Sequence, residues 1–101
     1  MPDPRIFPIP SAYTDHVTVL AVSTLVRAAN PHRVSLNLVN DGDSVIYLSL
    51  GNAAIVGDGM RINARGGSYH IGQSNLWLGN VYGITGDQEM CNMTISEGYM
   101  P

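Results

Sequence analysis

The sequence contains no lysine, and charged residues of all kinds make up only 13% of its 101 positions. Soluble domains average about 25% charged residues, and a small domain normally carries them on its large surface. The outside of this single-domain chain must therefore be mostly neutral. Its formal net charge is -3, and its five cations are all arginines: Arg5, Arg27, Arg33, Arg61 and Arg65.

The small number of basic residues indicates which kind of partner the protein can bind. A negative net charge without any run of lysine or arginine argues against nucleic-acid binding, because a phosphate backbone requires a basic patch. Interfaces between proteins, in contrast, are depleted in lysine and glutamate and enriched in arginine. The composition therefore favours a surface that neighbouring chains cover. The alternative is a weakly charged monomer whose exterior is rich in Ser, Asn and Gly.

Cysteine and long apolar runs are also scarce. Cys91 is the only cysteine, which excludes an intramolecular disulfide and a cysteine-based metal site, and we expect it to be a small buried residue. No apolar run approaches the roughly 18 residues that a membrane span needs. The N-terminus has neither the basic nor the apolar region of a signal peptide. We therefore expect synthesis in a cytoplasm and no contact with a membrane.

Motifs for catalysis or metal binding are lacking too. His16, His32 and His70 occur in three separate predicted elements without the spacing of metal-ligand pairs, and no serine lies in a G-x-S-x-G motif. The segment from Asn40 to Ser44 is similar to part of a calcium loop, but the glutamate that closes such a loop is missing. A turn is the better interpretation. We expect neither an enzyme nor a cofactor or metal site.

The N-terminal segment is rich in proline, with four prolines within the first ten residues. Each proline fixes its own φ and restricts the residue before it to extended geometry. We therefore predict that residues 1–15 form an extended arm, of which 12 residues could span up to about 40 Å. The residues predicted to contact a partner from this arm are Arg5, Ile6, Phe7, Ile9 and Tyr13. The alternative is a solvated disordered tail, although such tails are usually poor in apolar residues.

From residue 16 onward the pattern is one of short strands separated by turns. Strands are predicted at residues 16–22, 24–28, 33–40, 44–50, 52–56, 60–64, 68–71, 76–85 and 92–97. The clearest alternation places Val34, Leu36 and Leu38 on one face and Ser35 and Asn37 on the other. No window is typical of a helix. About eight short strands with frequent turns predict an all-β fold, a jelly-roll-like antiparallel β-sandwich over residues 16–101 that follows the extended Pro-rich N-terminal arm.

The connection after the third predicted strand is interpreted as a hairpin. A two-residue turn would set the leucine face against the wrong face of residues 44–50. A three-residue loop, 40–42, instead places Gly42 in the left-handed conformation and pairs Leu36 with Ile46. We prefer the longer loop.

Aromatic residues in the second half of the chain suggest a contact face. Tyr69, Trp77 and Tyr82 lie near several amide side chains and would suit a shallow sugar-binding face, although aromatics at such positions more often form core or oligomer contacts. In residues 76–85 the alternation puts Trp77 and Val81 on one side and Tyr82 on the other. With both faces apolar, one could line the core and the other an interface. The predicted oligomer or ligand face consists of Tyr69, Trp77, Val81 and Tyr82.

Two neighbouring segments carry a resemblance to a known group of proteins. The string Arg-Ala-Ala-Asn-Pro-His-Arg-Val-Ser-Leu-Asn-Leu-Val-Asn at residues 27–40 is followed by Ile-Tyr-Leu-Ser-Leu-Gly at residues 46–51. Together with residues 66–71, 79–84 and 92–97, this arrangement resembles small virion proteins of tailed bacteriophages. The motifs that carry the resemblance are patterns of strands and turns, and none of them encodes chemistry.

The resemblance implies a β-sandwich protein that decorates a phage capsid or forms part of a head fibre, usually as a trimer. We therefore expect a capsid decoration (cement) protein, made in the host cytoplasm and located in the virion at the capsid surface. Its expected partners are the major capsid protein and two further copies of itself, and the N-terminal arm would reach a neighbouring subunit. The alternative function is a glycan- or receptor-binding module of a head fibre or spike.

Overall fold

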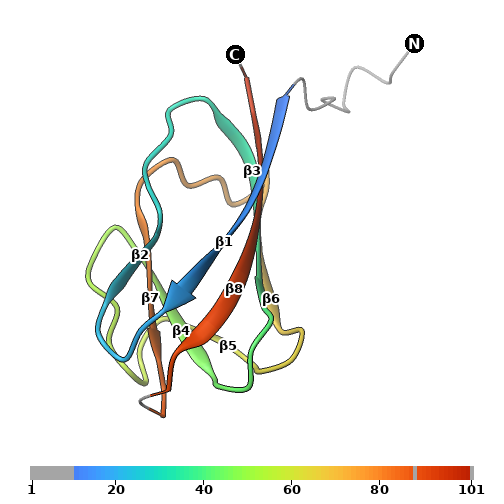
Figure 1. Ribbon diagram of the computed structural model, residues 1–101. Helices are drawn as coiled ribbons and strands as arrows, with labels where there is room; N and C mark the ends of the chain where they lie inside the picture. The colour runs from blue at the N-terminus through green and yellow to red at the C-terminus, as the bar shows by residue number, and fades with distance from the viewer. Residues whose placement is uncertain (1–10, 88, 101) are drawn as a thin grey trace.

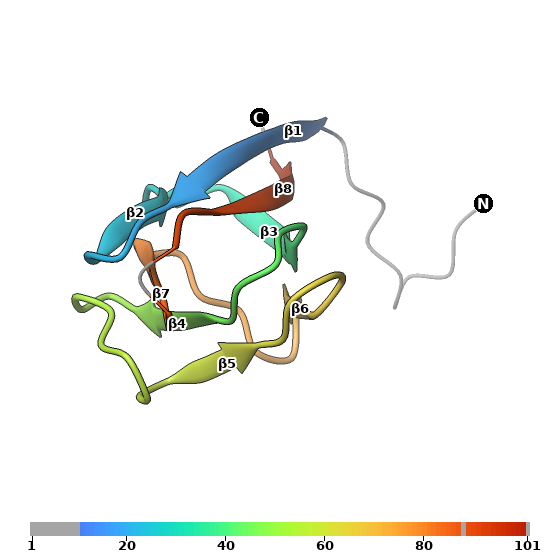
Figure 2. The same ribbon diagram turned by 60° about the horizontal axis from the view of Figure 1, so that its bottom comes forward.

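The computed structural model describes residues 11–87 and 89–100. They form eight strands: β1 (Ser11–Val19), β2 (Thr24–Arg27), β3 (Arg33–Asn40), β4 (Ile46–Leu50), β5 (Met60–Ile62), β6 (Ser68–Ile71), β7 (Val81–Thr85) and β8 (Cys91–Tyr99). Two four-stranded sheets, with the orders β1-β8-β3-β6 and β2-β7-β4-β5, pack against each other (Figures 1 and 2). The predicted all-β sandwich is confirmed. In this part of the chain no helix is long and apolar enough to cross a membrane.

The two sheets arise from nested pairs of strands. The strand β1 pairs with β8, β2 with β7, β3 with β6 and β4 with β5, and every pair is antiparallel. Two further antiparallel pairs, β3 with β8 and β4 with β7, join these four pairs into the sheets. This nested order is the jelly-roll arrangement of two interlocked Greek keys, as predicted.

The core lies between the two sheets and consists of every second side chain along the strands. Leu36 and Leu38 of β3 and Leu48 of β4 are completely buried, as expected for one inward face per strand. The alternation predicted for β3 is therefore confirmed at the two leucines. At the start of the strand a bulge between Arg33 and Ser35 shifts the register. As a result Arg33 is buried there, and not Val34, which the alternation predicted to face inward.

The predicted hairpin between β3 and β4 is wrong. The two strands belong to different sheets, so Leu36 and Ile46 enter one core from opposite sides instead of pairing side by side. The reason is the fully buried Asn40, whose Nδ2 donates a hydrogen bond to the Ser44 carbonyl oxygen at 2.7 Å. Its side chain replaces strand pairing at the corner where the chain leaves one sheet for the other. Gly42, expected in the left-handed conformation, has no positive φ.

The boundary predicted between arm and sandwich, at residue 15, is also wrong. The strand β1 begins at Ser11, and each residue from there to Val19 is paired with β8, because residues 11–19 contain no proline that would remove a ladder hydrogen bond. Tyr13 is therefore a strand residue and not part of an arm. The other predicted arm contacts, Arg5, Ile6, Phe7 and Ile9, lie outside the residues that the structure describes.

Two segments predicted as strands are loops. Residues 52–56 form no strand, and the chain turns at Gly51 and Gly57, whose φ values of 85° and 89° favour glycine. Residues 76–80 form a loop before β7 begins. There Trp77 packs against the core and donates its Nε1–H to the Asn80 carbonyl oxygen at 2.9 Å, which takes this stretch out of the sheet.

Candidate functional site

The loops of the sandwich gather at two opposite ends (Figure 1), and these ends differ in charge. The loops β3–β4, β5–β6 and β7–β8 gather at one end, and their charged residues are Asp41, Asp43, Arg65, Asp87 and Glu89. At the other end, residues 28–32, 72–80 and 98–100 include no aspartate, glutamate, lysine or arginine. We call these three segments the uncharged end and the opposite loops the acidic end.

Large apolar side chains are exposed at the uncharged end. Leu76 is 44% exposed, Leu78 38% and Met100 50%. Single exposed apolar residues are normal on a protein surface, but a group of them without intervening charge is typical of a contact site. The uncharged end is therefore the candidate functional site.

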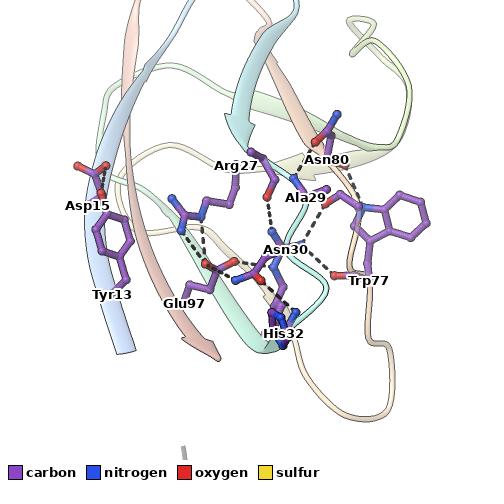
Figure 3. A network of polar contacts seen from close by, with 12 residues as sticks. Tyr13, Asp15, Arg27, Ala29, Asn30, His32, Trp77, Asn80 and Glu97 are labelled. Atoms are coloured by element: carbon purple, nitrogen blue, oxygen red, sulfur yellow. Dashed lines mark hydrogen bonds and ion pairs between the residues drawn. The ribbon is translucent and has the colours of Figure 1, made fainter. Parts of the chain in front are cut away.

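A buried ionic network lies beneath this end (Figure 3). The side chains of Arg33 and Glu97 are both 0% exposed, and Arg33 Nε lies 2.6 Å from Glu97 Oε2. Arg27 Nη2 lies 2.7 Å from the other carboxylate oxygen, Oε1, which also accepts a hydrogen bond from Asn30 Nδ2 at 3.3 Å. Buried charges are stable only when they are paired and hydrogen-bonded in this way. Since both oxygens have partners, the Glu97 carboxylate serves as a structural anchor.

Arg33 connects this anchor to two loops. Its Nη1 donates to the carbonyl oxygens of Trp77 at 2.9 Å and Gly79 at 3.1 Å. Its Nη2 donates to the carbonyl oxygen of Ala28 at 2.8 Å. A planar guanidinium with five N–H groups can serve a carboxylate and three carbonyls at once, which the single nitrogen of a lysine cannot. Arg33 thereby fixes the loops of the uncharged end to the core.

The segments of the uncharged end are also bonded to one another. The backbone N–H of Asn30 donates to the carbonyl oxygen of Leu78, and that of Met100 to the carbonyl oxygen of His32, each at 2.8 Å. The exposed leucines therefore project from backbone that is held from below and from the side. A surface ordered before binding loses less conformational entropy when a partner arrives.

The electrostatics of the network favour an ionised carboxylate. Burial opposes the charge of Glu97, but hydrogen bonds from Arg27, Arg33 and Asn30 outweigh this effect, and the pKa of Glu97 lies below its usual value. The hydrogen bond with Glu97 in turn raises the pKa of Arg27. In the folded protein near neutral pH, the Glu97 carboxylate and the Arg27 guanidinium are therefore both charged.

Tyr13 extends the network to the edge strand β1. The guanidinium carbon of Arg27 lies 4.7 Å from the centre of the Tyr13 ring, a cation–π distance. The Tyr13 hydroxyl donates to Asp15 Oδ2 at 2.9 Å, and this hydrogen bond is the main reason that the pKa of Tyr13 is raised. The pKa of Asp15 is lowered, first by the backbone N–H of His16 and then by Tyr13. Tyr13 is thus held in place as part of the sandwich.

The four residues predicted as one oligomer or ligand face do not share a surface. Val81 is 0% exposed and belongs to the core, because it is the first of the β7 side chains that point inward. Tyr69 and Trp77 are half-buried and pack against the same core. Only Tyr82 projects from the outer side of the β2-β7-β4-β5 sheet, where its hydroxyl accepts a hydrogen bond from Asn80 Nδ2 at 3.2 Å. These aromatic rings therefore form no common platform for a sugar.

Sequence reasoning missed the buried network, although a signal was present. Cys91, Met93, Ile95 and Glu97 occupy alternate positions of one strand, and all four are buried. A glutamate that continues an inward apolar series requires a buried cation as its partner. The alternation therefore pointed to an inward-facing arginine elsewhere in the chain. The expectation of a buried Cys91 is confirmed.

Comparisons with protein-family models, with curated proteins and with solved structures gave no match. Within the described ranges, no group of three histidine, cysteine, aspartate or glutamate side chains is placed to hold a metal ion. Function is therefore argued from the geometry of the uncharged end.

Proposed function

We propose that the protein is a structural attachment module that docks onto other protein chains through its uncharged end. The observation that carries the proposal is the asymmetry of the two ends. One end presents exposed leucines on ordered loops without charge, and the other carries four carboxylates. Removing water from an apolar surface without charges requires little free energy when an interface forms. The acidic end favours contact with water and would face away from the partner.

In its most specific form, the proposed function is capsid decoration, with the major capsid protein of a tailed phage as the partner. The resemblance of residues 27–51 to small virion proteins supports this form, and jelly rolls are common among viral capsid domains. Ser11, the first described residue, pairs with Tyr99 and so lies beside the uncharged end, and the predicted arm would start from there. Ten residues can span up to about 33 Å, which suits contact with a neighbouring capsid subunit.

The experiment is co-sedimentation of the purified protein with undecorated shells assembled from the major capsid protein. The test variants are Leu76→Asp and Leu78→Asp. The matched control is Met90→Asp, since Met90 is an exposed apolar residue of the acidic end, with 72% exposure. We expect a loss of affinity of at least about tenfold for the leucine variants, because a buried charge at an interface costs more than one tenfold step. The control should bind like the wild type.

Three outcomes of the sedimentation experiment count against the proposal. Equal binding by all variants, or a loss only with Met90→Asp, would mean that the uncharged end is not the docking surface. Absence of binding by the wild type would remove the capsid as partner. Light scattering of the free protein at several concentrations tests the proposed homotrimer separately, since a stable monomer would contradict self-association.

A further inference from the structure

The outer face of the β1-β8-β3-β6 sheet is polar but almost without charge. The strand register aligns its outward side chains in two rows across the four strands, Thr14, Ser96, Asn37 and His70 in one and His16, Thr94, Val39 and Ser68 in the next. None of them is an aspartate, glutamate, lysine or arginine. Solvent-facing surfaces usually carry interspersed charges of both signs. This face is therefore unusual for a surface that meets only water.

A shallow groove of about 780 Å³ runs along this face. Its floor includes Asn92, Thr94 and Ser96 of β8, and residues of the neighbouring strands β1 and β3 flank this floor on either side. From the spacing of residues and strands, the groove is about 13 Å long and about 10 Å wide. An open groove of this shape suits a chain that lies along β8 better than a small molecule enclosed on all sides.

The floor of the groove is rigid. The strand β8 is paired on both sides, with β1 and with β3, and the opposite side chains of β8, such as Met93 and Ile95, are buried in the core. The backbone is therefore already hydrogen-bonded, and a ligand meets side chains only. Threonine side chains have few rotamers, so ordering them on binding costs little entropy.

The hydroxyl groups of the groove are available. Among the side-chain hydrogen bonds of the described residues, none involves the side chain of Thr14, Thr94 or Ser96. Each hydroxyl can donate one hydrogen bond and accept two, and the Asn92 amide can do both as well. At the rim, Asp15 Oδ1 accepts the backbone N–H of His16 at 2.8 Å, which leaves further lone pairs for a ligand.

We propose that this groove binds a neutral carbohydrate chain. The hydroxyls of a sugar both donate and accept hydrogen bonds, as the lining does. An anionic ligand would need lysine or arginine, and neither lines the groove. An apolar ligand would need more than Val39, since the other aliphatic residue of the lining, Ile95, turns its side chain into the core. A peptide that adds as a strand needs unpaired backbone, which the floor does not offer.

The experiment is titration of the full-length protein with neutral oligosaccharides, cellohexaose, maltohexaose, chitohexaose and mannohexaose, and with hyaluronan as the anionic comparison. Binding is measured by saturation-transfer NMR and calorimetry. The test variants are Thr94→Val, which exchanges a hydroxyl for a methyl group of similar size, and Ser96→Ala. The matched control is Ser49→Ala, on a strand of the other sheet. We expect at least one neutral oligosaccharide to bind and each test variant to lose roughly tenfold in affinity.

The proposal is overturned if no neutral oligosaccharide binds, if hyaluronan binds better, or if the double variant of Thr94 and Ser96 binds like the wild type. Loss of shell binding by a folded double variant, without sugar binding by the wild type, would make the groove a protein interface and would also overturn it. Docking through Leu76 and Leu78 is measured by co-sedimentation with capsid shells, whereas the groove is tested by titration with sugars. The two proposals can therefore fail independently.

Discussion

Replacing Arg33 with methionine tests whether the buried network stabilises the uncharged end. The change keeps an apolar stem but removes the guanidinium that contacts Glu97 and three carbonyl oxygens. Removing one partner of a buried ion pair costs about 3–5 kcal/mol. Arg27 and Asn30 still contact the carboxylate, so we expect the lower half of that range, about 3–4 kcal/mol. For a domain of this size the loss lowers the Tm by roughly 15–30 °C.

The assay is thermal and urea unfolding followed by circular dichroism, with Arg65→Met as the control. Arg65 and Asp43 form an ion pair in which both side chains are at least 80% exposed, and such surface pairs contribute little. The control should therefore unfold within a few degrees of the wild type. If Arg33→Met also unfolds within a few degrees, the network is not what holds the loops, and the argument for an ordered docking surface fails.

Three further results are expected. The pKa of the Glu97 carboxyl is lower in the folded chain than its usual value of 4.5, so the ionised carboxylate should stabilise the fold fully above about pH 4.5 and less as the pH falls through the folded pKa. In urea unfolding between pH 7 and pH 3, Glu97→Gln should lower the free energy of unfolding at pH 7 and reduce the decrease of that free energy in acid. Asn40→Ala should lower the free energy of unfolding by at least about 2 kcal/mol, seen in the urea midpoint, because it leaves buried partners unsatisfied. Gly59→Ala should lower the Tm more than Gly57→Ala. Both glycines have positive φ, but only at Gly59 would an added Cβ clash with the Leu48 carbonyl oxygen, and equal losses would contradict this clash.

The existence of the strands could be predicted from the sequence because alternation and turn signals are local. Leu36 and Leu38 show it, since their spacing alone places them on one face. The pairing of the strands could not be predicted in the same way. Consecutive strands often pair, which favoured a hairpin after β3, and the buried amide of Asn40 that turns the chain into the other sheet has no local signature.

The candidate site shows a similar division. The neutral surface was evident from composition, and the exposed Leu76 and Leu78 lie where an apolar segment was recognised. The loop that carries them was not, because residues 76–85 were predicted as one continuous strand, whereas Trp77 packs against the core and β7 begins only at Val81. Arg33 faces inward only because of a bulge, and a bulge depends on the register with a strand more than 60 residues away. Contacts at such a distance follow from topology.

The position of β8 has a consequence for biosynthesis. It is the last of the eight strands in the sequence, yet it lies between β1 and β3 in its sheet. On a ribosome, β1 therefore has no strand to pair with until residues 91–99 have been made. Closure of such distant pairs is slow, and unpaired edges invite association with other chains. The scarcity of charge that leaves the folded surface open to partners also leaves the half-made chain poorly protected against copies of itself.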